Sequence, residues 1–405
     1  MGLAIRRVAT GLLAMLLLAG AGCTTLPRTR VSLADVPVAQ APQAAGNLRI
    51  FHAVWDLVNR KHYDPRFQGV NWEETAETFG LRVAAARDEK ELYLVLNEML
   101  GLLHDSHTHV LTPRQARERR TQVRVRIGFS LAFIENCWVV TEVLPESPAE
   151  RVGVKAGWIV VARNGQPLGA RIDFRPQEGE EARWDFIDDG DRPISLSPRA
   201  TRLSTASRQV VRPLEDGFIY LRFDAFDGVD RRWLGRQLQE HANVPGVVID
   251  LRRNPGGETF SLGVTIGEFF DRRVDCGTFT PRGGGRSIKN SWQIGSASYR
   301  GKVVVLVEGA TGSAAEIFSA VLQVHKRATV IGRRTAGAVL ASWFHRLPGG
   351  GELQLSREDY VAPGGRRIEG NGVEPDVIVT RTLADIRIGR DPDLAAALEV
   401  LRGKD

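Results

Sequence analysis

The hydrophobic pattern of the chain changes its period along the sequence, which predicts a mixed α/β protein made of several domains. Apolar residues recur at helical spacing from Leu48 to about Arg114, and they alternate with polar residues at strand spacing from Gln122 to about Ala200. Beyond residue 216, short β-branched runs alternate with amphipathic segments, which is typical of a layered α/β core. With 405 residues, the chain is also too long for one compact core.

The N-terminus has the pattern of a cleaved export signal over residues 1–22. Two arginines precede an apolar stretch that is shorter than the roughly twenty residues of a membrane-spanning helix. Small residues then lead to Cys23, which is similar to a bacterial lipoprotein signal, although Gly20 stands where that signal usually has leucine. We therefore expect an acylated Cys23 and a flexible tether over residues 23–46, which would anchor an exported protein to a membrane of the periplasm or cell envelope.

The same patterns predict where the folded domains begin and end. We expect a helical domain at residues 47–119, a β-rich domain at 120–205, an α/β core at 206–384 and a C-terminal helix at 385–405. The formal net charge of +6 is not gathered into a long basic block, so nucleic-acid binding is not indicated. Cys137 and Cys276 fall in different predicted domains. A disulfide is one option in an oxidising envelope, and two buried free thiols are the preferred interpretation.

A serine at a predicted strand-to-helix turn is the strongest chemical signal in the chain. The string Glu308-Gly-Ala-Thr-Gly-Ser313-Ala-Ala-Glu316 follows an apolar run and opens an amphipathic segment. The start of a helix offers free N–H groups and the positive end of the helix dipole, which stabilise the negative charge that develops in acyl transfer. The same string is also a capping-box pattern, in which Ser313 would serve only as the N-cap.

A second turn has matching chemistry. The string Asn254-Pro-Gly256-Gly257 follows a buried-type strand, and glycines let backbone N–H groups come close to a substrate carbonyl. Together the two turns resemble the S41 family of serine peptidases, which includes the C-terminal processing and the tricorn-type proteases. The resemblance implies that Ser313 is the nucleophile. It also implies an oxyanion hole formed by the N–H of Ala314 and that of Gly256 or Gly257.

The general base separates two branches of this family. In the processing branch the base is a lysine, and the position in this chain that corresponds to it holds Ala338. In the tricorn-type branch the base is a histidine from the N-terminal region that follows a serine and is assisted by a late glutamate. Ser106 and His107 match that string. The resemblance therefore implies that His107 is the base, that Ser106 supports it, and that Glu369 orients His107, with Glu374 as the substitute.

A metal site is the rival interpretation of this histidine-rich segment. His104, His107 and His109 together with Asp105 could supply metal ligands. Their spacing does not place the three imidazoles on one face of a helix, and no remote ligand motif accompanies them. We expect neither a metal nor a cofactor.

The predicted β-rich domain is similar to a PDZ domain. Its string Arg126-Ile-Gly128-Phe129 matches the loop whose N–H groups bind a peptide's C-terminal carboxylate, while the following strand pairs with the peptide. Gly128 and Phe129 are therefore the expected peptide-binding residues. Trp158 departs from the pattern, because an aspartate usually follows the preceding glycine.

These resemblances imply an α/β multidomain protein with an N-terminal helical domain, a PDZ-like β module and a crotonase-like catalytic core of spiral ββα units. The implied activity is that of a serine endopeptidase that cleaves unfolded or C-terminal polypeptide segments through an acyl-enzyme. The alternative is a catalytically inactive protein of the same fold that binds peptide or lipid.

Overall fold

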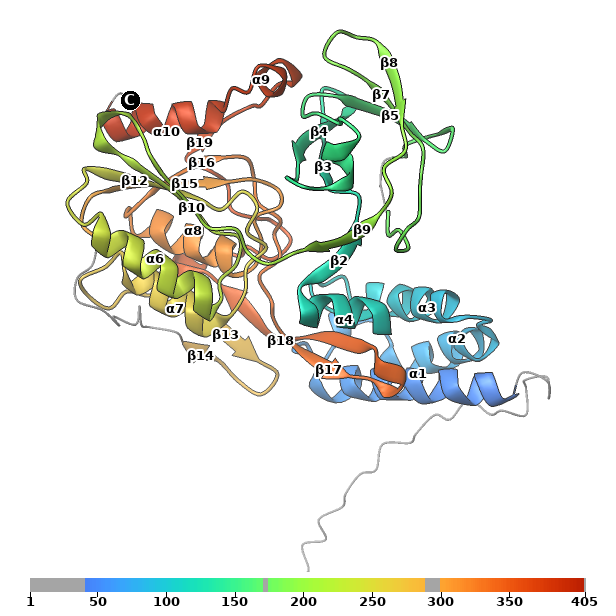
Figure 1. The fold of residues 1–405 in the computed structure, drawn as a ribbon. Helices are drawn as coiled ribbons and strands as arrows, with labels where there is room; N and C mark the ends of the chain where they lie inside the picture. The colour runs from blue at the N-terminus through green and yellow to red at the C-terminus, as the bar shows by residue number, and fades with distance from the viewer. Residues whose placement is uncertain (1–40, 170–173, 288–298, 404–405) are drawn as a thin grey trace, which may run out of the picture.

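The computed structural model of the protein describes residues 41–169, 174–287 and 299–403, which form three regions (Figure 1). We call them the helical region (residues 41–121), the β module (residues 127–200) and the core (residues 205–403). Figure 1 shows the helical region and the β module on the same side of the core. The predicted export signal and Cys23 lie outside the described residues.

Helices of the helical region pack around an apolar centre that includes Phe51, Leu96 and Met99, all fully buried. The helices are α1 (Ala41–Lys61), α2 (Trp72–Ala85), α3 (Glu89–Gly101) and α4 (Pro113–Thr121). Helix α1 begins earlier than predicted, so residues 41–46 are helical and not part of a flexible tether. The reason is tertiary, since Ala44 is buried and the Asn47 side chain, one turn further, donates to the carbonyls of Val83 and Ala86.

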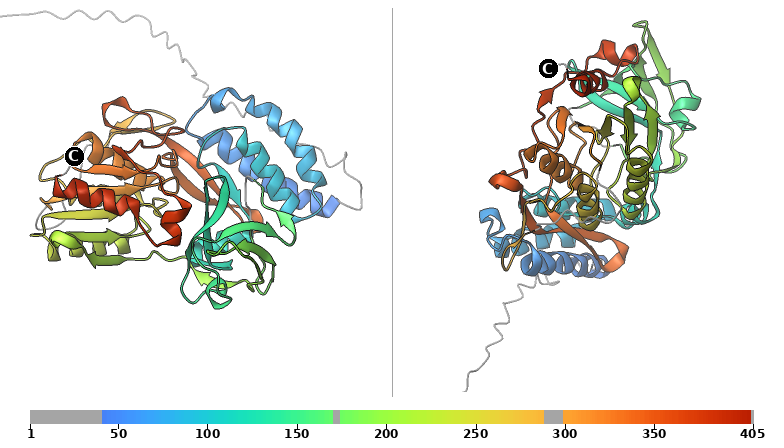
Figure 2. Two further views of the ribbon diagram at one scale, coloured as in Figure 1. Left: turned by 90° about the horizontal axis from the view of Figure 1, so that it is seen from above. Right: turned by 90° about the vertical axis from the view of Figure 1, so that its left-hand side faces the viewer.

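A hairpin from the late part of the chain packs against these helices. It consists of β17 (Ala341–Arg346) and β18 (Glu352–Val361), and Leu353 and Leu355 belong to the same apolar cluster as α1 to α3. Strand β1 (His109–Leu111) pairs antiparallel with β18, with His109 opposite Gln354. Further along its length β18 also pairs with β13 (Thr278–Pro281), which in turn pairs with β14 (Arg286–Ser287). This sheet joins the helical region to the core (Figure 2).

The β module is an antiparallel sheet with strand order β3-β4-β5-β7-β8, and β6 pairs with β5. Its elements are β3 (Phe129–Ile134), β4 (Cys137–Val143), α5 (Pro148–Arg151), β5 (Ile159–Arg163), β6 (Gln166–Pro167), β7 (Trp184–Ile187) and β8 (Pro193–Leu196). Trp158, Trp184 and Phe186 fill its centre. Strand β3 lies at one edge of this sheet, so one side of its backbone has no strand partner among the described residues.

A two-stranded ribbon connects the β module to the rest of the chain. It pairs β2 (Val123–Arg126) with β9 (Thr201–Ser204). The strand spacing predicted from the sequence includes residues 123–126 but ends at about residue 200, before β9. The alternation in 123–126 is real, but the partner strand lies far away in sequence and could not be predicted locally.

The core is built on a sheet with strand order β10-β11-β12-β15-β16-β19. Strands β11 to β19 along this order are parallel, and β10 is antiparallel to β11. The strands are β10 (Val210–Pro213), β11 (Ile219–Arg222), β12 (Gly246–Asp250), β15 (Lys302–Val307), β16 (Thr329–Gly332) and β19 (Val377–Ile378). Because β12 and β15 are neighbours, the turns that follow them open at the same edge of the sheet.

Helices cover both faces of this sheet (Figures 1 and 2). One face packs against α6 (Gly228–Glu240), α7 (Thr259–Gly267) and α8 (Ala314–Val324) through a large apolar cluster. The other face packs against α10 (Pro392–Arg402), which follows the short α9 (Leu383–Arg387). Single 3₁₀ turns lie at Phe67–Gly69, Glu215–Gly217, Pro348–Gly350 and Pro363–Gly365. The predicted mixed α/β multidomain architecture with an N-terminal helical region is confirmed.

Two smaller features bear on the environment of the protein. Cys137 and Cys276 are free thiols, and only Cys276 is fully buried, whereas both were expected to be. Within residues 41–403, leaving out the gaps in the description, no helix combines the length and the apolar character needed to cross a bilayer.

Candidate active site

Ser313 lies directly before α8, in a backbone conformation that an ordinary N-cap does not use. Its φ is 50° and its ψ is −121°, whereas N-caps usually have extended geometry. A positive φ at a residue with a side chain costs on the order of 1–3 kcal/mol and is concentrated at functional sites. A strained strand-to-helix turn also exposes the nucleophile in other serine hydrolases. The N-cap interpretation accounts for the position of Ser313 but not for this conformation.

Glu316 holds the surroundings of Ser313 in place. Its fully buried carboxylate accepts hydrogen bonds from the N–H of Ser313 (3.1 Å), the Thr335 hydroxyl (2.5 Å) and the N–H groups of Gly337 (2.7 Å) and Ala338 (2.8 Å). Burial raises the pKa of this carboxyl, and these four donors oppose that rise. The capping-box glutamate of the sequence therefore ties the loop at 335–338 to the Ser313 turn.

The second glycine turn lies against Ser313. A Cβ atom on Gly256, whose φ is +102°, would be 2.6 Å from the Ser313 Cβ, so only glycine fits there. Asn254 shapes the turn, since its side-chain oxygen accepts from the N–H of Gly256 (2.9 Å) and its side-chain nitrogen donates to the carbonyl of Phe223 (3.0 Å). The N–H of Gly256 is thus already engaged.

This engagement narrows the set of candidate oxyanion donors. Within the described residues, no hydrogen bond uses the N–H of Gly257 or that of Ala314. Gly257 is exposed, and Ala314 is the first residue of α8. Of the two glycines named from the sequence, Gly257 therefore has the free donor. In known serine hydrolases one such donor stabilises the transition state by about 3 kcal/mol.

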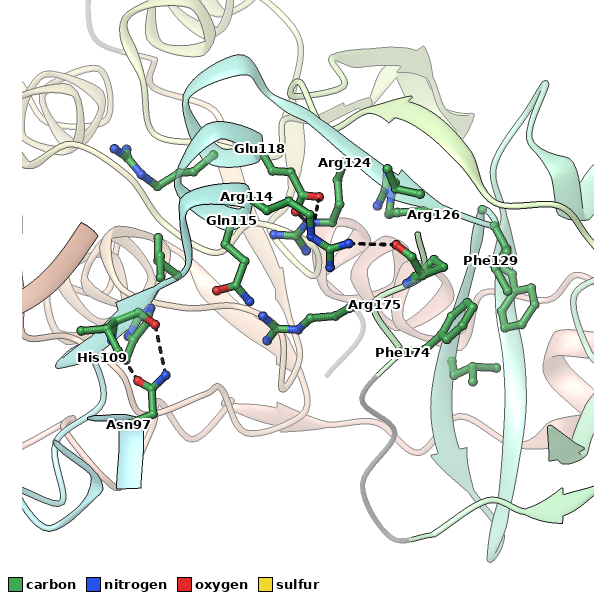
Figure 3. Close-up of a pocket in the computed structure, with 18 of the residues that line it drawn as sticks. Asn97, His109, Arg114, Gln115, Glu118, Arg124, Arg126, Phe129, Phe174 and Arg175 are labelled. Atoms are coloured by element: carbon green, nitrogen blue, oxygen red, sulfur yellow. Dashed lines mark hydrogen bonds and ion pairs between the residues drawn. The ribbon is translucent and has the colours of Figure 1, made fainter. Parts of the chain in front are cut away.

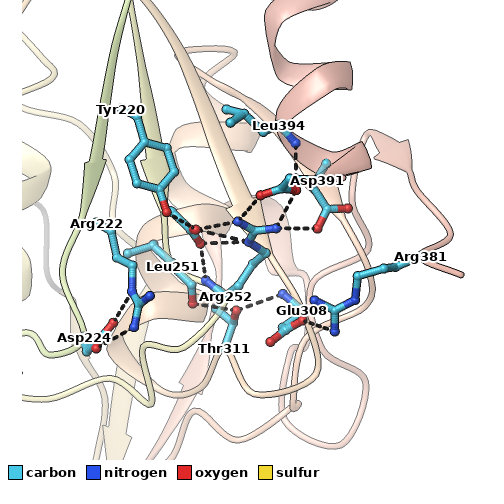
Figure 4. Close-up of polar contacts among 12 residues, drawn as sticks. Tyr220, Arg222, Asp224, Leu251, Arg252, Glu308, Thr311, Arg381, Asp391 and Leu394 are labelled. Carbon is cyan, nitrogen blue, oxygen red and sulfur yellow. Dashed lines mark hydrogen bonds and ion pairs between the residues drawn. The ribbon is translucent and has the colours of Figure 1, made fainter. Parts of the chain in front are cut away.

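Hydrogen bonds join the two turns to each other. The Thr311 hydroxyl donates to the carbonyl of Leu251 (2.8 Å), and the N–H of Gly312 donates to the carbonyl of Asn254 (3.0 Å). Nearby, the largely buried Arg252 binds the carboxylates of Asp250, Asp391 and Asp393, as part of the polar cluster that Figure 4 shows at the strand ends. This cluster fixes the loop after β12 and the start of α10 in one arrangement.

The candidate base lies in the loop between α3 and β1. Asp105 organises this loop by accepting from the N–H groups of His107 (3.0 Å) and Thr108 (2.6 Å). The same carboxylate contacts His62 Nε2 (2.8 Å) and accepts from the Ser356 hydroxyl (3.0 Å) on β18. Burial would raise the Asp105 pKa, but the contacts with His62 and Thr108 bring the pKa below its ordinary value. Through these contacts the Asp105 carboxylate holds the loop between α3 and β1 in place.

His107 is connected to Glu369 through a serine. Ser106 Oγ lies 2.6 Å from His107 Nδ1, and the N–H of Ser106 donates to Glu369 Oε1 (3.1 Å). The sequence predicts that the Glu369 carboxylate orients the imidazole, and in the structure it is the Ser106 hydroxyl that contacts Nδ1. Glu374, the substitute, pairs with Arg334, and no hydrogen bond or ion pair among the described residues joins it to this network.

Two consecutive residues connect this network to Ser313. The N–H of Val339 donates to Glu369 Oε2 (2.8 Å), and the carbonyl of Ala338 accepts from the N–H of Ser313 (2.8 Å). The position that corresponds to the lysine base is therefore at the centre of the site, but its methyl group cannot carry a proton. No hydrogen bond between His107 Nε2 and Ser313 Oγ is present among the described residues, so that contact remains a prediction.

Burial sets the protonation of these groups. It lowers the pKa of His107 below its ordinary value, which favours the neutral imidazole that a base needs near pH 7. It raises the pKa of Glu369, and the donors from Val339 and Ser106 oppose this rise. Among the described residues no group of three or more histidine, cysteine, aspartate or glutamate side chains is placed to hold a metal ion.

The expected carboxylate loop precedes the edge strand β3. Gly128 has a φ of +98°, and a Cβ atom there would lie 2.2 Å from the Ser147 Cβ. Within the described chain, the N–H groups of Ile127 and Gly128 have no acceptor. Phe129, the first residue of β3, packs edge-on against Trp184.

Sequence reasoning missed two residues that organise the site. His62 carries no local motif, and only its buried contact with Asp105 reveals a role. Thr335 donates to Glu316 and accepts from the N–H of Val373 (2.7 Å). Only one feature of the sequence could have drawn attention to Thr335: it lies three residues before Ala338, the position that corresponds to the lysine base.

Two family models match parts of this chain. Residues 217–379 match the model of Peptidase family S41, and residues 45–101 match that of the Tricorn protease C1 domain. A carboxyl-terminal-processing protease of Picosynechococcus sp. is 28% identical over 86% of this chain and 87% of its own length.

Solved structures share the fold at lower identity. The photosystem II D1 C-terminal processing protease has a TM-score of 0.58 at 24% identity and covers 88% of this chain and 97% of its own. Mature CPAF has a TM-score of 0.65 at 12% identity, with 89% of this chain and 97% of its own covered. The family model that matches the core and the processing protease that aligns along most of both chains show that this chain is similar to the peptidases of family S41.

Proposed function

We propose that this protein is a serine endopeptidase that cleaves unfolded or C-terminal segments of polypeptides with Ser313 as nucleophile and His107 as base. One observation carries the proposal. The Ser106, His107 and Glu369 network and the strained Ser313 meet at the adjacent residues Ala338 and Val339. Groups that are remote in sequence and suited to acyl transfer thus share one site.

The proposed reaction begins when Ser313 Oγ attacks the scissile carbonyl carbon. His107 Nε2 accepts the hydroxyl proton, so Nδ1 must carry its hydrogen and donate it to Ser106 Oγ. The Ser106 hydroxyl is then free to donate to the Glu369 carboxylate, whose negative charge stabilises the imidazolium. The N–H groups of Ala314 and Gly257 stabilise the oxyanion. His107 then returns the proton to the leaving amine, which departs and leaves the acyl-enzyme on Ser313. Water hydrolyses this acyl-enzyme by the same steps.

The β module is proposed to be a PDZ-like domain that binds the substrate. Strand β3 is at the edge of its sheet, which suits addition of an extended peptide as a further strand. The N–H groups of Ile127 and Gly128 would bind the terminal carboxylate. The parallel sheet with its covering helices is proposed to be the crotonase-like core.

The cellular setting follows from the N-terminal sequence. We place the protein in the periplasm or cell envelope, attached through an acylated Cys23. The wild-type protein would then fractionate with membranes and a Cys23→Ser variant would not. Recovery of the wild type as a soluble protein cleaved after Cys23 would contradict the anchor and leave the catalytic proposal intact.

A fluorophosphonate probe tests the catalytic proposal, because it reacts with activated serines. The probe should label the wild type at Ser313, as located by mass spectrometry, and should not label Ser313→Ala. A Ser197→Ala variant, which changes an exposed serine of the β module, is the matched control and should label normally. Labelling at another serine would refute the assignment. No labelling and no peptide cleavage would favour the inactive binding protein.

A further inference from the structure

A large pocket lies between the β module and the helical region. It has a cavity volume of about 870 Å³ and is bordered by the Ile127 and Gly128 loop at one end and by β1 at the other. His109, at the β1 end, is two residues beyond the candidate base. The pocket therefore extends from the expected carboxylate loop toward the catalytic site.

The charge of the pocket is strongly positive. Among the described residues, five arginines and one acidic residue, Glu118, line it; the arginines are Arg114, Arg119, Arg124, Arg126 and Arg175. They come from α4, from the β2 ribbon and from the loop before β7, which are separate segments. We call this site the arginine pocket. Figure 3 shows Arg114, Arg124 and Arg175 gathered in its middle.

The surrounding protein balances these charges only in part. Arg119 pairs with Glu352 outside the pocket (2.8 Å), and Arg114 donates to the carbonyl of Pro176 (3.2 Å). Glu118 lies 3.8 Å from both Arg114 and Arg124 and is shared between them. Arg126 donates to the carbonyl of Ser204 (3.1 Å), but its Nε is buried without a partner among the described residues. Burial and the neighbouring guanidinium groups, Arg124 foremost, lower the Arg126 pKa. An anionic occupant would relieve both the repulsion and the missing hydrogen bond.

Apolar side chains complete the lining. Phe129 and Leu131 of β3, together with Phe174, lie beside the arginines. Phe174 also stacks under the guanidinium of Arg163 at 3.9 Å from the ring centroid. A surface that combines aromatic rings, guanidinium groups and free backbone N–H groups suits a polypeptide better than a small inorganic anion.

We propose that the arginine pocket binds the acidic C-terminal tail of a polypeptide substrate. The α-carboxylate lies on the N–H groups of Ile127 and Gly128, and aspartate or glutamate side chains in the last few residues contact Arg124 and Arg126. This inference rests on the proposed peptidase function and adds a substrate class to it. Tails with carboxylates are selected over neutral or basic ones of equal length.

Peptide binding to the full chain with Ser313→Ala tests the inference without cleavage. Fluorescent ten-residue peptides with an acidic tail, with the matching glutamine and asparagine tail, and with an amidated C-terminus are compared by anisotropy. A charge-assisted hydrogen bond contributes enough to predict about tenfold tighter binding of the acidic peptide than of either other peptide. This preference should disappear at about 0.5 M NaCl, because screening acts over a few ångströms there.

Variants locate the preference in the pocket. Arg124→Gln and Arg126→Gln should each reduce it, whereas Arg183→Gln, an exposed arginine of the same module outside the pocket, should retain it. Equal affinity for acidic and neutral tails overturns the proposal, and so does a preference that Arg124→Gln and Arg126→Gln leave unchanged. Equally tight binding of a single-stranded DNA oligonucleotide would indicate a general polyanion site and overturn it too. If the Arg124→Gln and Arg126→Gln variants do not fold, the salt series on the Ser313→Ala protein tests the proposal.

Cleavage by the protein with Ser313 intact separates this inference from the function on which it rests. Arginine-dependent binding without cleavage would support the pocket and count against the peptidase. Cleavage of all tails at equal efficiency would support the peptidase and count against the pocket.

Discussion

Replacing Ser106 by alanine tests the unusual feature of this site, which is the serine between the base and the carboxylate. The change removes the 2.6 Å contact at His107 Nδ1 and leaves Glu369 held only by the N–H groups of Ser106 and Val339. Hydrogen bonds to charged groups are worth about 1.5–3 kcal/mol. Because the imidazole is charged in the transition state, kcat should fall about tenfold to a hundredfold with little change in KM.

The pH profile distinguishes this role from a structural one. Ser106 and Glu369 stabilise the imidazolium, so their loss lowers the His107 pKa further. The acid limb of kcat/KM should therefore move to lower pH while the plateau falls. Ser106→Thr keeps a hydroxyl and should recover most of the activity, and steady-state cleavage of a quenched fluorescent peptide measures all three proteins. An unchanged kcat, or a loss confined to KM, would show that the serine does not act through the base.

Three further predictions concern the same site. In the wild type, kcat/KM should rise with pH to a midpoint below the ordinary histidine pKa of about 6.5, because burial lowers the pKa of His107 and only the neutral form accepts a proton; a midpoint above that value would contradict this. Gly256→Ala should abolish phosphonate labelling of Ser313 and lower the melting temperature, because the new Cβ would lie 2.6 Å from the Ser313 Cβ, and normal labelling would refute the close packing. Ala338→Lys should not restore peptide cleavage to His107→Ala, since a lysine base needs its own depressed pKa, and full recovery would assign the site to a lysine mechanism.

The sequence by itself determined the local features of this protein. The apolar runs from Val303 to Val307 and from Val247 to Leu251 predicted buried strands, which the structure places side by side. Glycines marked the turns that follow them, because a positive φ is nearly free only for glycine. The sequence also showed that position 338 lacks a lysine, and so directed attention to His107. These signals are local, and each is complete within a few residues.

Only the tertiary structure decided how the pieces meet. The pairing of β1 with β18 carries the His107 loop to Glu369, and no local pattern specifies a partner so far along the chain. The same folding places the Ser106 hydroxyl on His107 and engages the N–H of Gly256, which leaves Gly257 as the free donor. It also gathers arginines from separate segments into one pocket. Contacts of this kind depend on the packing of whole layers, since periodicity fixes which face of an element is buried but not what covers it.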